Sequence, residues 1–159
     1  MALDITEKKS ALETSLERAA ELLGDITPHV YDIYYRRCPE AKADFEYHFP
    51  GDNHPLEGQM VEQALYCLME WYDSPGEIEI ILLSTVPHHI ETLKIEPSHF
   101  SELIVAVCET IVSTIPAQNT EELAVWEELR GELMALFEAS ARYARPAMLQ
   151  PGSSRLESP

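Results

Sequence analysis

The chain has 159 residues, of which 45% are hydrophobic and only six are glycine, a composition that suits one packed domain and argues against disorder or a fibrous repeat. Its 11 basic and 28 acidic side chains give a formal charge of -17, which would repel phosphate backbones and anionic lipid surfaces. We therefore expect neither nucleic acid nor a membrane as a partner.

The cysteines indicate a reducing environment. Cys38, Cys67 and Cys108 are an odd number, lie far apart and form no Cys-x-x-Cys pair, so neither a disulfide framework nor a zinc site is indicated. The sequence shows no charged-then-apolar leader and no uninterrupted apolar run of about 18 residues. These features predict a cytoplasmic protein with reduced thiols.

The first part of the chain has the periodicity of amphipathic helices. From Ile5 to Leu23, apolar residues recur at intervals of three and four among charged ones, and Gly24 ends the pattern. Asp25 or Thr27 can cap a second helix that continues to Arg37. Two consecutive helices are therefore predicted.

The middle of the chain continues the helical pattern. Pro39 stops the second helix, and a short helix to Phe45 comes next. The turn-forming residues at positions 49–55 predict a loop, and the stretch from Leu56 to Tyr72 predicts a helix that residues 74–76 break. The chain is expected to change direction at both breaks.

The segment 77–93 is ambiguous, because its β-branched residues alternate locally as in a strand, but its helical neighbours favour a helix. Pro97 suits the first turn of a strongly apolar helix that reaches Ile115. We expect this helix to be central and buried.

A long final helix is predicted, with Asn119 or Thr120 as its cap and Pro146 at its end. The residues after Pro146 are typical of a mobile tail. We therefore expect an all-α fold with one domain over residues 1–146 and a disordered tail over residues 147–159.

His89 stands out among the six histidines because of the residues that come after it in the chain. A neutral imidazole is a suitable axial ligand for the iron of a porphyrin. With His89 facing the iron, Leu93 lies one turn further on and Ile95 just beyond, and both would contact the porphyrin face. Phe100 and Leu103 on the next helix would extend this apolar wall. A lone histidine on an apolar helix is more often an ordinary core residue, but this context favours a ligand.

Two segments carry a resemblance to a known family. The run from His89 to Phe100 is similar to the proximal corner of globins, and the run from Tyr31 to Phe45 resembles bacterial flavohaemoglobins and single-domain haemoglobins. The resemblance covers roughly residues 5–143 in the family's helix order. It implies a globin-like helical fold that binds haem b, iron protoporphyrin IX.

The resemblance also implies individual roles. His89 would be the metal ligand, although His88 would take its place in a slipped register. Phe45 would wedge the haem at the corner. Tyr31 would be the distal tyrosine, whose hydroxyl could donate a hydrogen bond to bound dioxygen.

The distal helix leaves its register open. The usual family interval from His89 leads to Met60, which Gln59 and Gln63 flank, and many bacterial relatives have glutamine at this place. We prefer a glutamine that pairs with the ligand, with Met60 or Ala64 lining the pocket.

The leading hypothesis is therefore a haem globin that binds dioxygen, nitric oxide or carbon monoxide, as a monomer or a homodimer. Phe100 and about Ala141 stand where flavohaemoglobins have a tyrosine and a glutamate, which puts peroxidase-like or dioxygenase chemistry in doubt. At this length we expect no fused reductase domain, so any redox turnover in nitric oxide or peroxide detoxification would need a separate reductase. The alternative is a haem-free, globin-like sensor or interaction module in bacterial signalling.

Overall fold

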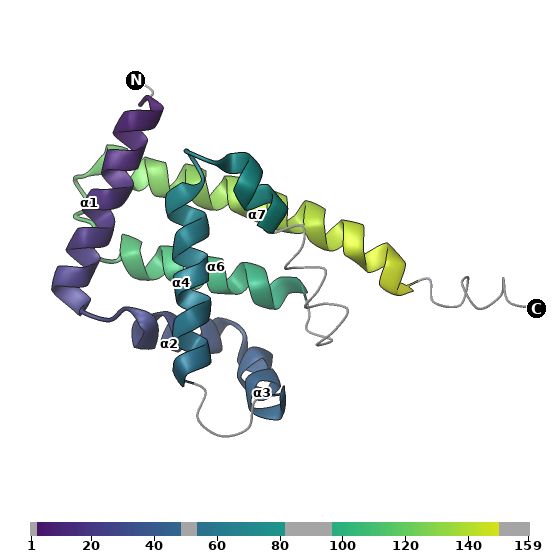
Figure 1. Cartoon of the computed structure of the whole chain (residues 1–159). Helices are drawn as coiled ribbons and strands as arrows, with labels where there is room; N and C mark the ends of the chain where they lie inside the picture. Colours follow the sequence, from purple (N-terminus) through teal and green to yellow (C-terminus); the bar gives the residue numbers. More distant parts are fainter. Residues whose placement is uncertain (1–2, 49–53, 82–96, 150–159) are drawn as a thin grey trace, which may run out of the picture.

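Helices account for all the regular secondary structure in the computed structural model over residues 3–48, 54–81 and 97–149, the part of the chain that it describes. Within that part, side chains are described at positions 3–43, 57–81 and 101–139. The predicted all-α fold class is thereby confirmed. Figure 1 shows how α4 crosses over α2 and α6 while α7 extends past them.

Helix α1 spans Ile5–Leu23, the bounds that the periodicity predicts. The Asp4 side chain caps its start by accepting a hydrogen bond from the Glu7 backbone N–H at 2.8 Å. Gly24 ends it with a φ of 70°, in the left-handed region that favours glycine, and its N–H donates to the Ala20 carbonyl.

Helix α2 spans Thr27–Arg37, and α3 spans Pro39–His48. The backbone N–H of Thr27 donates to Asp25 Oδ1 at 3.0 Å, so Asp25 supplies the acceptor at this helix start. The break between the two helices lies where Pro39, which has no backbone N–H, cannot continue the ladder of α2. Proline is tolerated in a first turn, so the same residue begins α3.

Helix α4 spans His54–Glu70, and a further helical stretch is described at residues 75–81. This stretch settles part of the ambiguity at 77–93 in favour of a helix. Ile78 is buried whereas Ile80 is 68% exposed, as expected for residues two apart on opposite sides of a helix. The rest of the 77–93 segment lies outside the described residues.

Helix α6 spans Pro97–Val112 and carries the centre of the hydrophobic core. Its consecutive residues 103–108 are all buried, so this helix is covered around its whole circumference. Helices α1, α2, α4 and α7 all pack against it. The prediction of a central, buried helix is therefore confirmed.

Helix α7 spans Thr120–Leu149. The Asn119 carbonyl accepts the N–H of Leu123 at 3.1 Å, at the helix start that the sequence predicts. The helix end expected at Pro146 is wrong, because α7 continues through it. A proline removes the bond of its own N–H but leaves helical angles accessible to the residues after it. Residues 150–159 of the expected tail lie outside the described residues.

A buried polar network joins α1 to α7. The indole Nε1 of Trp126 donates to Ser15 Oγ at 2.9 Å, and both side chains are almost completely buried. Ser15 Oγ also lies 2.5 Å from Glu122 Oε1, which accepts a hydrogen bond from Arg18 Nη1 at the same distance. Arg18 Nη2 reaches the second Glu122 oxygen at 3.2 Å, so the guanidinium binds the carboxylate through two nitrogens.

Among the described residues, no helix combines the length and the apolar character needed to cross a membrane.

Replacing the buried Ser15 should destabilise the protein. Ser15→Ala leaves the Trp126 indole N–H without its acceptor in the core, which costs about 1–3 kcal/mol of unfolding free energy. Urea denaturation of the two proteins measures this difference. Ser10→Ala on the exposed part of α1 is the matched control and should stay within about 0.5 kcal/mol of wild type. Equal stability of the Ser15 and Ser10 variants would refute the role of the network.

Glu122 should make stability depend on pH. Burial by itself would raise the pKa of this carboxyl, but hydrogen bonds from Arg18, Ser15 and Asn119 outweigh it and lower the pKa below the ordinary 4.5. A lowered pKa in the folded state means that the stabilisation is present near neutral pH and is lost as the pH falls through the folded-state value. We expect Glu122→Gln to lower the melting temperature at pH 7 and to approach wild type below about pH 4. A difference that persists unchanged at acid pH would contradict this.

Candidate functional site

The predicted distal tyrosine lies in a buried core to which three mutually packed helices contribute. Tyr31 on α2 is 4% exposed, and it belongs to the same buried core as Ala64 on α4 and Leu103 on α6. The contacts of α2 with α6, of α4 with α6 and of α2 with α4 bring these helices together. Tyr31, Ala64 and Leu103 come from separate parts of the sequence and were predicted to line one pocket. They belong to one core.

The candidate residues on α4 divide between its two faces. Ala64 is buried and Met60 is partly buried against the core, whereas Gln59 and Gln63 are exposed. Gln63 Nε2 lies 4.0 Å from the sulfur of Cys67, one turn further along the helix. Of the alternatives left open by the sequence, the apolar ones lie on the core side of α4 and the glutamines on the solvent side.

Several predicted residues fall where no side chain is described. His88, His89, Leu93 and Ile95 lie outside the described residues. The backbones of Phe45 and Phe100 belong to α3 and α6, but their side chains are outside the described set. The described part of the site is therefore the wall formed by α2, the core face of α4 and the first half of α6.

A cluster of three tyrosines surrounds the distal position. The Tyr31 ring centroid lies 5.6 Å from that of Tyr34, edge to face, and 5.2 Å from that of Tyr35 in a tilted arrangement. The rings of Tyr34 and Tyr35 are stacked at 5.5 Å. These are the separations at which aromatic pairs attract one another. The Tyr31 ring is thus held on two sides by neighbours from its own helix.

Glu57 ties this cluster to the first turn of α4. The Tyr35 hydroxyl donates a hydrogen bond to Glu57 Oε2 at 2.8 Å, which joins α2 to α4. Burial first, and then the negative charge of Glu57, raise the pKa of Tyr31 well above its ordinary value of 10.0. Tyr31 is therefore a neutral phenol at physiological pH, and its hydroxyl keeps the proton that a hydrogen-bond donor needs.

Glu57 and Tyr35 are the residues of this site that the sequence analysis misses. Tyr35 comes four residues after Tyr31, so both lie on one face of α2, and this spacing is a signal that was available. The pairing with Glu57 depends on how α4 crosses α2, and a periodicity within one helix does not contain that information.

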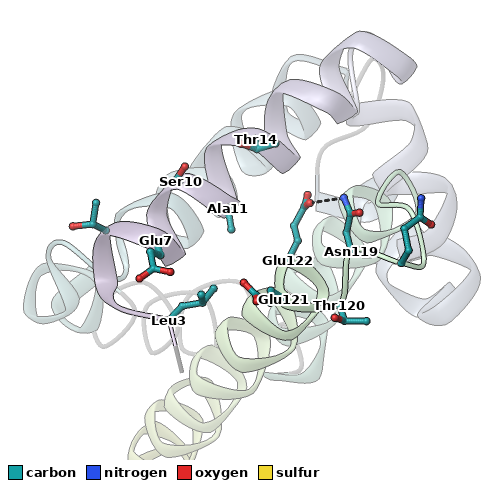
Figure 2. A pocket seen from close by; sticks show the side chains of 11 residues that line it. Leu3, Glu7, Ser10, Ala11, Thr14, Asn119, Thr120, Glu121 and Glu122 are labelled. Carbon is teal, nitrogen blue, oxygen red and sulfur yellow. Dashed lines mark hydrogen bonds between the residues drawn. The ribbon is translucent and has the colours of Figure 1, made fainter. Parts of the chain in front are cut away.

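A hollow of about 700 Å³ opens beside Tyr31. Tyr31 and Tyr35 line it from α2, Glu57 and Gly58 from α4, and Lys42 from α3. It connects solvent with the edge of the tyrosine cluster. A second hollow of about 720 Å³ lies between the starts of α1 and α7, and its lining includes Ser10 and Thr14 of α1 and Glu121 and Glu122 of α7 (Figure 2). Glu122, at its edge, is already bound to Asn119, Ser15 and Arg18.

The described residues contain no group of three or more His, Cys, Asp or Glu side chains that could hold a metal ion. Haem does not require such a group, because the porphyrin supplies four ligands to iron and the protein needs to supply only one. What haem requires of these residues is an apolar wall, and Ala64, Leu103 and Met60 fit that requirement.

Comparison with known proteins finds no matching family model, no matching curated protein and no matching solved structure. Conclusions about function therefore rest on the residues and their arrangement.

The thiols should be unreactive in the folded protein. Cys38, Cys67 and Cys108 are free and buried, and burial raises the pKa of each thiol, that of Cys108 to about 12. Because the thiolate is the reactive form, we expect Ellman's reagent at pH 8 to label none of them until urea unfolds the chain and all of them afterwards. Rapid labelling of a thiol without denaturant would contradict the described burial.

Proposed function

We propose that this protein is a globin that holds haem b and binds a diatomic gas, with His89 as the iron ligand and Tyr31 as the distal hydrogen-bond donor. Haem would supply an iron with an open axial position for dioxygen, nitric oxide or carbon monoxide. The observation that carries the proposal is the burial of Tyr31, as a neutral phenol, in one core with Ala64 and Leu103. The order and pairwise packing of the described helices are compatible with this class.

The described residues have separate tasks in this proposal. Ala64, Leu103 and the partly buried Met60 would cover the porphyrin with apolar surface and exclude water. Tyr31 would donate to the outer oxygen of bound dioxygen, which carries partial negative charge. A neutral phenol suits this task because a phenolate has no proton to donate and would repel that charge.

Absorption spectroscopy of the protein with added hemin tests whether haem is bound. We expect a Soret band that shifts on reduction and again with carbon monoxide. His89→Ala should abolish the five-coordinate spectrum, whereas His88→Ala should leave it unchanged. A protein that remains colourless with hemin would refute the proposal and favour the haem-free sensor or interaction module.

Tyr31→Phe tests the distal role. A hydrogen bond to a charged group contributes about 1.5–3 kcal/mol, so its removal should speed dioxygen release about 10- to 150-fold. Stopped-flow displacement of dioxygen by carbon monoxide measures this rate. Tyr66→Phe is the matched control, because Tyr66 is 42% exposed and its hydroxyl donates to Glu77. A Tyr31→Phe protein that releases dioxygen at the wild-type rate would remove Tyr31 from the role.

A further inference from the structure

We propose that the hollow between α2 and the first turn of α4 is the approach by which small molecules from solvent reach Tyr31, and that Glu57 keeps it narrow by holding the Tyr35 hydroxyl. Glu57 and Tyr35 are positioning residues in this proposal, because they act through Tyr31. The role of the hollow as a gas route rests on the proposed function. The control of access to Tyr31 does not.

The first argument is the position of Tyr31 relative to solvent. Its side chain is almost completely buried, yet it forms part of the lining of a hollow of about 700 Å³. Tyr34 is equally buried at 2% exposure and does not line this hollow. The solvent side of the cluster is therefore at Tyr31, and a small movement of the lining there would admit water or a gas molecule to it.

The second argument is the hydrogen bond that joins the adjoining wall to α4. Tyr35 is only partly buried, its ring lies 5.2 Å from the Tyr31 ring, and its hydroxyl is fixed by Glu57 across the gap between α2 and α4. Breaking this bond removes one restraint on the Tyr35 ring, while its stacking on Tyr34 remains. Since a typical hydrogen bond shifts such an equilibrium about 2- to 10-fold, access to Tyr31 should rise by that factor.

The third argument concerns Gly58, which lines the same hollow one residue after Glu57. A Cβ at Gly58 would have open space around it, so a side chain can start there without a clash. Gly58 has ordinary helical backbone angles, and replacing a glycine in a helix by a better helix former is favourable to the backbone. A bulky residue at position 58 should therefore obstruct the hollow without disturbing the fold.

Hydroxyl-radical footprinting with mass spectrometry tests the control of access, with or without haem. We expect oxidation of Tyr31 to rise about 2- to 10-fold in Glu57→Ala and in Tyr35→Phe, while oxidation of Tyr34 stays constant. Glu57→Gln keeps an acceptor for Tyr35 and should restore protection. Glu62→Ala, on the exposed face of α4, is the control and should match wild type. An unchanged Tyr31, or an equal rise at Tyr34 from general loosening of α2, would overturn the proposal.

Carbon monoxide rebinding after flash photolysis of the haem-loaded chain tests the route. Glu57→Ala should accelerate bimolecular rebinding about 2- to 10-fold, and Gly58→Phe should slow it. Gly131→Phe is the matched control, because a Cβ at Gly131 also meets nothing within 4 Å and α7 does not line the hollow.

The outcomes separate the two proposals. Failure to bind haem refutes the proposed function, and the footprinting result still decides whether Glu57 controls access to Tyr31. If the protein binds haem but none of these variants changes the rebinding rate, the route is refuted and the proposed function stands.

Discussion

The middle of helix α6, residues 103–108, is buried on every side, which requires other helices to cover it all round. Helices α1, α2, α4 and α7 provide this cover, so the packing of each is constrained by the same central element. The candidate site is a consequence of this constraint. Tyr31 and Ala64 belong to one buried core with Leu103 because α2 and α4 must both lie against α6.

Basic residues are scarce in this chain, and several of them form ion pairs between helices. Several lysine and arginine side chains of the described residues bind carboxylates on another helix. Arg37 at the end of α2 contacts Glu102 and Glu109 on α6, and Lys8 on α1 contacts Glu128 on α7. Such partly exposed pairs add little stability each, about 0–1 kcal/mol. Their value in a chain of charge -17 lies in relieving repulsion where acidic helix faces come together.

The sequence predicted the features that are determined within a single helix, such as where the helix begins and ends. The bounds of α1 can be derived from its periodicity and from Gly24, and the start of α7 from the polar residues before it. The continuation of α7 through Pro146 was missed, because a stop signal of this kind is a tendency that a long helix can override. The bond between Tyr35 and Glu57 and the burial of Ser15 against Trp126 were missed because each depends on how two helices cross. The exposure of Gln59 and Gln63 was missed because it depends on the rotation of α4 about its own axis.

Tyrosine and tryptophan side chains bind several of the carboxylates that lysine or arginine would bind in a less acidic protein. Tyr72 donates to Glu128 at 3.0 Å, Trp71 donates to Glu132 at 2.5 Å, and Tyr35 donates to Glu57 at 2.8 Å. A phenol or indole satisfies a carboxylate without adding a charge. Burial first, and then the carboxylate, raises the pKa of the Tyr35 and Tyr72 phenols.

The hydrogen bond between Tyr35 and Glu57 lies within the candidate site. An unengaged carboxylate facing bound dioxygen would repel its partial negative charge. The Tyr35 hydroxyl engages Glu57, and the negative charge of Glu57 adds to burial in raising the pKa of Tyr31. Under the proposed function, an acidic residue thus supports a neutral hydrogen-bond donor beside the gas.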